Sequence, residues 1–358
     1  MDNHYILPIS NNEALNGRDF ENHIEFEHIH CALCGSSDWD VLIISQDKNY
    51  RVQGTFQAVQ CRNCSLIYQN PRPTIETVGL CYPQNYGPHQ KAINVNELHD
   101  SAFFRWKEHI KEIVADLYFF NNNQSSNIWE RIEFFPFYIH SRFFRLVVLP
   151  NPERESCVLD IGCGNGNFLA EMKRKGWQVW GVEPDAKASS LANDLLDNRV
   201  KTSIFTTGLF PPNSFDLITM WHVLEHIPDP TSAFFEVTRL LKPGGIFVSM
   251  VPNIASLEFL VFKENWLLLD LPRHLFHFTP KTIHGFSTKL GLQLVKIDFH
   301  IERRTLEASI RNFLNLEVRQ PNGLAWRLLG NFLWLISFIL AHLHTSGTMT
   351  VYCRKKGG

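Results

Sequence analysis

Three features that would assign a protein to a broad class are missing from this chain of 358 residues. Its 34 basic and 36 acidic side chains give a formal net charge of -2, which offers no general attraction to nucleic acid or anionic lipid. The N-terminal sequence MDNHYILPISNNEALN has no basic stretch followed by an apolar one, so we expect no secretory signal. Four of the eight cysteines form two close pairs and the rest are scattered, which argues against a disulfide framework and predicts a cytoplasmic location.

The chain also lacks a long uninterrupted apolar run. Its strongest candidate, residues 324–344, contains LLGNFLWLISFILAHLH but is interrupted or bounded by Arg327, Asn331, His342 and His344. We favour a buried or amphipathic helix before the last strand. The alternative is a helix that lies on a membrane surface, which would suit a lipid-linked substrate.

The sequence pattern divides the chain into four parts. Residues 1–26 are polar and rich in asparagine, and we expect a flexible tail. Residues 27–85 hold both cysteine pairs among short strand-like runs and predict a small module. Residues 86–150 carry aromatic-rich helical patterns, which predict a helical cap or linker. Strand and helix patterns alternate over residues 151–358, with a hydrophobic helical insertion at about 304–345.

The alternation in the last part predicts an α/β fold. The apolar runs VLDI, QVWGVE, FDLITMW and IFVSMVP read as strands, and amphipathic helical patterns separate them. Asp185 and Thr279, the latter followed by Pro280, are the expected N-caps of two helices. Such alternation builds a mostly parallel sheet with helices on both faces.

A turn with three glycines follows the first of these strands. Gly162, Gly164 and Gly166 leave room for a ligand to approach the backbone at the carboxyl end of the strand. The dinucleotide fingerprint GxGxxG would require its third glycine at the position of Asn167. That glycine lets a helix N-terminus receive a pyrophosphate, so its absence disfavours a dehydrogenase.

Two acidic residues flank this turn. Glu183 ends the next strand, where a carboxylate can accept hydrogen bonds from both hydroxyls of a ribose. Asp160 stands just before the turn and suits a cationic ligand better than a phosphate. Together these residues favour S-adenosylmethionine (SAM) over a nicotinamide cofactor.

The motifs VLDIGCGNG, GVEPD, SFDLITMWHVLEHIPDP and LKPGG, in this order and spacing, resemble those of class I SAM-dependent methyltransferases. The resemblance covers residues 156 to about 302 closely and the last strand more loosely, and it implies a Rossmann-like, doubly wound, mostly parallel seven-stranded sheet. It gives no adenine contact in the segment SIFTTGLFPPNS. The cofactor-binding residues that it implies, together with the residues argued above, are Asp160, Gly162, Cys163, Gly164, Gly166, Glu183, Pro184, Met220, Trp221 and His222.

The paired cysteines predict a metal site. Cys31 and Cys34 form one CxxC pair, Cys61 and Cys64 a second, and four thiolates at this spacing can close a tetrahedral structural site. We expect zinc, with rubredoxin-like iron as the alternative. The segment resembles the zinc-ribbon modules that precede methyltransferase domains in sugar-modifying and polysaccharide-associated enzymes.

Catalytic candidates lie after the fifth strand, in ENWLLLDLPRHLFHFTP. This segment resembles one in which a histidine reaches the acceptor pocket, so His274 is our first candidate for a general base, with His277 second and His226 third. The alternative is that these imidazoles only pack between aromatic rings. We expect Glu225 to support the local structure.

These inferences predict an enzyme that transfers a methyl group from SAM to a small molecule, with a hydroxyl of a sugar or glycoconjugate precursor as the expected acceptor. The alternatives are a non-catalytic SAM-fold binding module and a methyltransferase directed at carbon, nitrogen or a macromolecule. No nucleic-acid partner is expected, because the chain has no basic excess and TMWHVLEH replaces the motif of base-directed enzymes.

Overall fold

The computed structural model describes residues 23–82, 147–316 and 324–357, and the side chains of residues 324–328 are not described. Most of the expected tail over residues 1–26 and of the expected cap over residues 86–150 lies outside this part of the chain.

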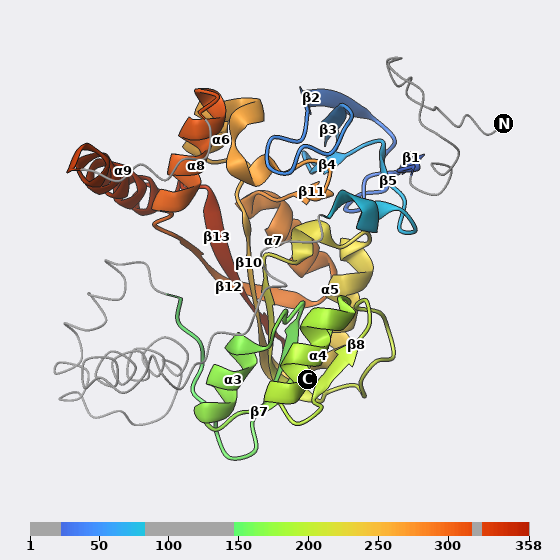
Figure 1. Cartoon of the computed structure of the whole chain (residues 1–358). Helices are drawn as coiled ribbons and strands as arrows, with labels where there is room; N and C mark the ends of the chain where they lie inside the picture. The colour runs from blue at the N-terminus through green and yellow to red at the C-terminus, as the bar shows by residue number, and fades with distance from the viewer. Residues whose placement is uncertain (1–22, 83–146, 317–323, 358) are drawn as a thin grey trace, which may run out of the picture.

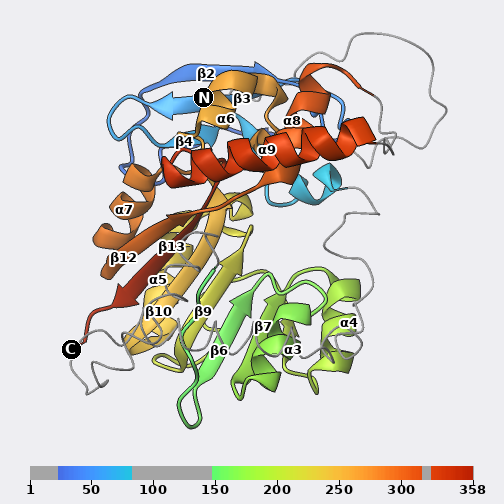
Figure 2. The same ribbon diagram turned by 90° about the vertical axis from the view of Figure 1, so that its left-hand side faces the viewer.

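A seven-stranded sheet forms the centre of the molecule, in the strand order β12-β13-β10-β9-β6-β7-β8 (Figure 2). The four central strands and β8 pair in parallel, and β13 runs antiparallel to both of its neighbours. This confirms the predicted Rossmann-like, mostly parallel sheet. Its strands are β6 (Cys157–Ile161), β7 (Gln178–Glu183), β8 (Val200–Thr202), β9 (Phe215–Trp221), β10 (Leu241–Pro252), β12 (Leu292–Phe299) and β13 (Thr348–Lys355).

Helices cover both faces of this sheet because its strands are apolar on both sides. Leu159 on β6 belongs to a core with Phe234 and Phe286, whereas its neighbour Val158 packs with Leu169 and Met172 on the opposite face. The helices are α3 (Asn167–Arg174), α4 (Ala186–Leu195), α5 (Pro230–Leu240), α6 (Leu257–Phe262), α7 (Pro280–Lys289), α8 (Arg303–Phe313) and α9 (Leu324–His342). Short 3-10 turns are η1 (Val78–Cys81), η4 (Leu224–His226), η5 (Lys263–Asn265) and η6 (Leu267–Leu269).

Helix starts follow the predicted caps. The Asp185 carboxylate accepts a hydrogen bond from the backbone N–H of Ala188 and begins α4. Thr279 forms a capping box with Thr282 at the start of α7, with Pro280 in the first turn. These bonds satisfy N–H groups that have no partner inside their own helix.

A second, four-stranded sheet contains the cysteine pairs and has the order β11-β4-β3-β2. Its strands β2 (Trp39–Ser45), β3 (Phe56–Cys61) and β4 (Ile67–Gln69) come from the predicted module, but β11 (Phe276–His277) comes from the segment between α6 and α7. Strands β1 (Phe26–Glu27) and β5 (Arg72–Pro73) form a separate pair. Figure 1 shows this module at one end of the molecule, beside α5 and α7. The module therefore shares a sheet with the segment of our histidine candidates.

The hydrophobic insertion consists of α8 and α9, between β12 and β13. Ribbons α6, α8 and α9 gather at one end of the molecule in both views (Figures 1 and 2). Across the described ranges, none of the helices combines the length and the apolar character that a membrane span needs.

Candidate functional site

The glycine turn joins β6 to α3 at the carboxyl end of the sheet. All three glycines have positive φ angles, of 70° at Gly162, 53° at Gly164 and 80° at Gly166. A Cβ at Gly162 would overlap Val223, and one at Gly166 would lie 3.0 Å from Cβ of Ala192. The turn therefore requires glycine for its backbone conformation and for close packing, in addition to the ligand access that the sequence indicated.

Glu183 closes this turn from the end of β7. One oxygen of its carboxylate accepts the N–H of Gly164 at 2.8 Å, and the other accepts the N–H of Asp185 at 2.9 Å. The side chain is buried, and each oxygen keeps a second lone pair for a further donor. The carboxylate is therefore held rigidly where two ribose hydroxyls can donate to it.

Asp160 lies beneath the same turn. Its side chain is buried and accepts a hydrogen bond from the Thr219 hydroxyl at 2.6 Å. Burial raises the pKa of Asp160 to about 8. A cation beside it would offset the cost of ionising this carboxyl group, as we expected for the charged end of SAM.

The other predicted cofactor residues differ in whether their side chains are available to a ligand. Cys163 is buried in the core beside Gly181, and Pro184 is exposed. The Met220 side chain belongs to the core, whereas Trp221 packs edge-on against Phe168 with ring centroids 5.2 Å apart. Only the backbone of Met220 is thus available to a ligand.

Trp221 and His222 stand at the carboxyl end of β9, beside the glycine turn. Trp221 Nε1, like Asn167 Oδ1 at the start of α3, is buried without a hydrogen-bond partner among the described residues. His222 has a φ of 55° and contacts Glu225 through Nδ1 at 3.3 Å. The two unpartnered polar atoms fit a polar ligand at this edge of the sheet.

The structure brings the three candidate histidines together, although they come from two segments. The rings of His226 and His274 lie 4.7 Å apart, and those of His274 and His277 lie 6.2 Å apart. Nitrogen atoms of His226 and His274 and a carboxylate oxygen of Glu225 lie within 4.8 Å of one another. Glu225, which we expected to be structural, is therefore part of the same cluster.

Each histidine has a different environment. His274 Nδ1 lies 2.9 Å from the Leu268 carbonyl oxygen, and because a carbonyl only accepts, Nδ1 carries the hydrogen, which leaves the lone pair of the neutral ring on Nε2. Burial lowers the pKa of His226 to about 4 and that of His277 to about 3. Both ring nitrogens of His277 are buried and have no partner in the described part of the chain. Burial opposes ionisation of Glu225, but the hydrogen bond with His222 lowers its pKa overall.

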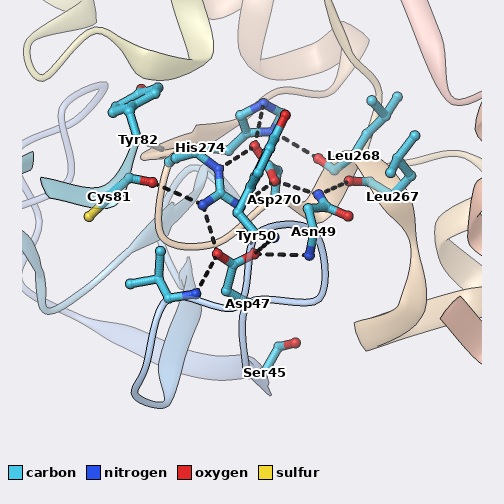
Figure 3. Close-up of polar contacts among 12 residues, drawn as sticks. Ser45, Asp47, Asn49, Tyr50, Cys81, Tyr82, Leu267, Leu268, Asp270 and His274 are labelled. Atoms are coloured by element: carbon cyan, nitrogen blue, oxygen red, sulfur yellow. Dashed lines mark hydrogen bonds and ion pairs between the residues drawn. The ribbon is translucent and has the colours of Figure 1, made fainter. Parts of the chain in front are cut away.

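An ion cluster that the sequence did not reveal lies beside the histidines. Arg273 is fully buried and contacts the carboxylates of Asp47 and Asp270. Figure 3 shows Asp47, Asp270 and Asn49 converging on this cluster, with His274 at its edge. Asp47 and Arg273 are 226 positions apart in the chain, so no local motif could have indicated their pairing.

The four cysteines of the module also converge, with one sulfur atom from each lying within 4.8 Å of the others. Sulfur atoms of Cys31 and Cys64 are 3.4 Å apart, and those of Cys34 and Cys61 are 3.5 Å apart. A tetrahedral site with Zn–S bonds of about 2.3 Å requires sulfur separations of about 3.8 Å. The donor set and its spacing therefore fit a closed metal site.

Comparison with known proteins agrees with the fold and the glycine turn. Residues 137–297 match a family model described as a methyltransferase domain. The ubiquinone biosynthesis O-methyltransferase of Cupriavidus pinatubonensis is 32% identical over 152 residues, which are 39% of this chain and 61% of that protein. Its counterpart in Nitrosospira multiformis is 37% identical over 124 residues, which are 32% of this chain and 52% of that protein.

Two solved structures are also similar. A SAM-dependent methyltransferase from Archaeoglobus fulgidus has 20% identity and a TM-score of 0.40, covering 71% of this chain and all of that one (100%). One from Mesorhizobium loti has 19% identity and a TM-score of 0.40, covering 58% of this chain and 94% of that one.

The matched segment holds the glycine turn, Glu183 and the parallel strands β6, β7, β9 and β10. The domain is thus a methyltransferase domain. More narrowly, the motifs of the turn and of β9 within this segment resemble those of class I SAM-dependent methyltransferases.

Proposed function

We propose that the protein transfers a methyl group from SAM to a hydroxyl of a small-molecule acceptor. The observation that carries the proposal is the buried Glu183 carboxylate, fixed by the N–H groups of Gly164 and Asp185 beside a glycine turn of intact geometry. A non-catalytic module would be expected to have a damaged glycine turn or to lack the acidic residue, whereas here both are intact. Calorimetry should therefore detect SAM binding, and tight binding of NADH without SAM binding would contradict the proposal.

The residues provide the following chemistry. SAM supplies an electrophilic methyl group, and Asp160, Glu183 and the glycine turn would hold it. An acceptor hydroxyl that forms the new O–C bond must lose its proton, and His274 can take it at Nε2, which keeps its lone pair. Burial lowers the pKa of His226 to about 4 and that of His277 to about 3, which makes each a poor proton acceptor near neutral pH. We keep His274 as the first candidate.

A sugar or glycoconjugate precursor is the acceptor that we propose first, because the cysteine module resembles those of sugar-modifying enzymes. The curated relatives are named for ubiquinone biosynthesis, which makes an acceptor of that pathway the second candidate. A screen for methyl transfer from radiolabelled SAM should compare sugar nucleotides, lipid-linked sugars and ubiquinone precursors. Labelling of the third group alone would reverse our order.

We also propose that the four cysteines hold one structural zinc ion. The close sulfur atoms support this, and a module with so few strands gains much of its stability from a metal. Elemental analysis should find about one zinc per chain. Iron in its place would support the alternative, and folded protein without metal would contradict both.

Peripheral contact with a membrane is a further part of the proposal, within a cytoplasmic location. Large apolar side chains on α9 and in the turn just after it are exposed, at 58% for Phe332 and 48% for Leu335 on the helix and 62% for Leu343 in the turn. Leu260 and Val261 on α6 are exposed as well. Lipid vesicles should co-sediment with the protein, and Phe332→Ser with Leu343→Ser should weaken this more than the same change at exposed Ile204. Equal binding by all variants would contradict the membrane role.

A further inference from the structure

Arg273 forms the most deeply buried ion cluster among the described residues. Its guanidinium contacts Asp47 at 2.8 and 2.7 Å and Asp270 at 3.0 and 2.6 Å. It also donates to the carbonyl of Cys81 at 3.1 Å, and its carbon atom Cζ lies 4.6 Å from the ring centre of Tyr50. Asp47, Tyr50 and Cys81 come from the N-terminal part of the chain, so this side chain ties the cysteine module to the segment that follows η6.

The carboxylates of this cluster are themselves held in place. The backbone N–H groups of Tyr50 and Val52 donate to Asp47, at 3.1 and 3.0 Å. Asn49 donates to Asp270 and to the carbonyl of Leu267 (Figure 3). Burial alone would raise the pKa of Asp47, but the hydrogen bonds from Arg273 lower it overall. Buried charges whose donors and acceptors are satisfied in this way have little freedom to move.

The backbone of the same segment holds the candidate histidines. The Arg273 carbonyl lies 3.0 Å from His226 Nδ1 and accepts its hydrogen, because a carbonyl cannot donate. The Asp270 carbonyl accepts the backbone N–H of His274 at 3.0 Å, and an oxygen of the Asp270 carboxylate lies 3.8 Å from His274 Nε2. The Arg273 carbonyl thus helps to orient the His226 ring. Asp270 fixes the backbone of His274 and places a carboxylate beside its ring, which the Leu268 carbonyl holds at Nδ1.

The cysteine site connects to the same segment through the second sheet. Strand β3 ends at Cys61, whose N–H donates to the Leu66 carbonyl just before β4. Strand β4 pairs with β11, and the N–H of Gln69 donates to the Leu275 carbonyl at 2.8 Å. A ligand that closes the four cysteines would therefore fix the strand next to β11. Within the described part of the chain, the hydrogen bonds, ion pairs and ring contact of Arg273 involve neither the glycine turn nor Glu183.

We propose that Arg273 is a positioning residue through which the cysteine module orients His226 and His274. In consequence, metal in the four-cysteine site controls the geometry of the acceptor side while leaving the SAM side unchanged. This inference rests on the proposed function, since orienting the histidines matters only if they act on an acceptor. Its test does not require a known acceptor.

The test uses the full chain with isotope-labelled histidine and follows the imidazole resonances by NMR. Asp47→Asn should shift or broaden the signals of His226 and His274. The signal of His300, which is buried just after β12 and bonded to Thr350, should not move and serves as the reference. Asp40→Asn is the matched control, because Asp40 lies in the same module and forms only an exposed pair with Arg62. It should leave all these signals unchanged.

A second arm tests the metal. Cys34→Ser should move the same two signals as Asp47→Asn, whereas Cys157→Ser, outside the cysteine cluster, should not. The dissociation constant of SAM, measured by calorimetry, should change by less than about twofold in each folded variant, since the altered sites share no contacts with the SAM side. A parallel loss of SAM affinity would overturn the selective coupling.

The remaining outcomes are also decisive. Unmoved His226 and His274 signals in folded Asp47→Asn would overturn the positioning role. If Asp47→Asn does not fold, Asp47→Glu is measured instead, because it keeps the charge. It should displace the signals of His226 and His274 and leave the His300 signal unchanged. If the wild-type protein binds no SAM, the proposed function fails, but the histidine signals still report whether Arg273 positions them.

Discussion

The proposed SAM side and the proposed acceptor side of the site are built in different ways. The SAM side consists of one short turn, Gly162 to Gly166, and the carboxylate of Glu183, joined by backbone hydrogen bonds. The acceptor side is made of side chains from distant segments, with Asp47 and Arg273 as its most deeply buried ion pair. A site made of one local turn tolerates changes elsewhere in the chain, whereas a site assembled from buried charges depends on every partner.

The largest effect that distinguishes the two sides is expected at His274. His274→Gln should lower turnover by about 10²–10⁴-fold, the usual contribution of a general base, with little change in SAM affinity. The measurement is initial rate with the acceptor found in the screen, together with calorimetry of SAM. His284→Gln on the exposed side of α7 is the control. Unchanged turnover in His274→Gln would remove it as the base.

A second comparison concerns stability. Arg273→Met leaves Asp47 and Asp270 buried without their cation, so the free energy of unfolding should fall by about 3–5 kcal/mol. Denaturant unfolding monitored by circular dichroism measures this. Arg62→Met, which breaks an exposed pair in the same module, should leave the midpoint nearly unchanged. Equal midpoints for the two variants would show that the buried cluster contributes no more than a surface pair.

The SAM side should respond to loss of one charge. Glu183→Gln replaces a charged hydrogen-bond acceptor with a neutral one. Because a hydrogen bond to a charged group contributes about 1.5–3 kcal/mol, this change should weaken SAM binding by about 10–100-fold. Glu171→Gln on α3 is the control, since Glu171 pairs with Arg174 away from the turn. Histidine signals should not move in either variant, and their displacement would mean that the two sides are coupled.

The smallest effect is a pH dependence of SAM affinity. Burial raises the pKa of Asp160 to about 8, so most of the free protein carries this group protonated at pH 7. If SAM binds the ionised form, affinity should rise with pH by up to about tenfold per unit below pH 8 and level off above it. Calorimetry should also detect proton release at pH 7. Asp160→Asn should remove the part of the pH dependence and of the proton release that comes from the protein. If the pH profile of SAM affinity is unaltered in this variant, the pH dependence comes from SAM itself.

The fold was largely predictable from local patterns. Strand β6, the caps Asp185 and Thr279, and the alternation of strand and helix all depend on residues that are neighbours in sequence. Strand β11 was not predicted, because two residues are too few to show alternation and only pairing with β4 makes them a strand. The domain boundaries stay predictions. Strand β11 belongs to the sheet of the cysteine module although it lies within the predicted methyltransferase part of the chain.

The candidate site divides in the same way. By itself the sequence determined the methyltransferase domain, the glycine turn with Glu183 and the two cysteine pairs, because each depends on short-range spacing. Only the tertiary structure gathered His226, His274 and Glu225, and placed Arg273 between Asp47 and Asp270. The reason is physical. A buried charge needs an opposite charge that lies close to it in the folded state, and two residues 226 positions apart in the chain form no periodic sequence pattern that would indicate the pairing.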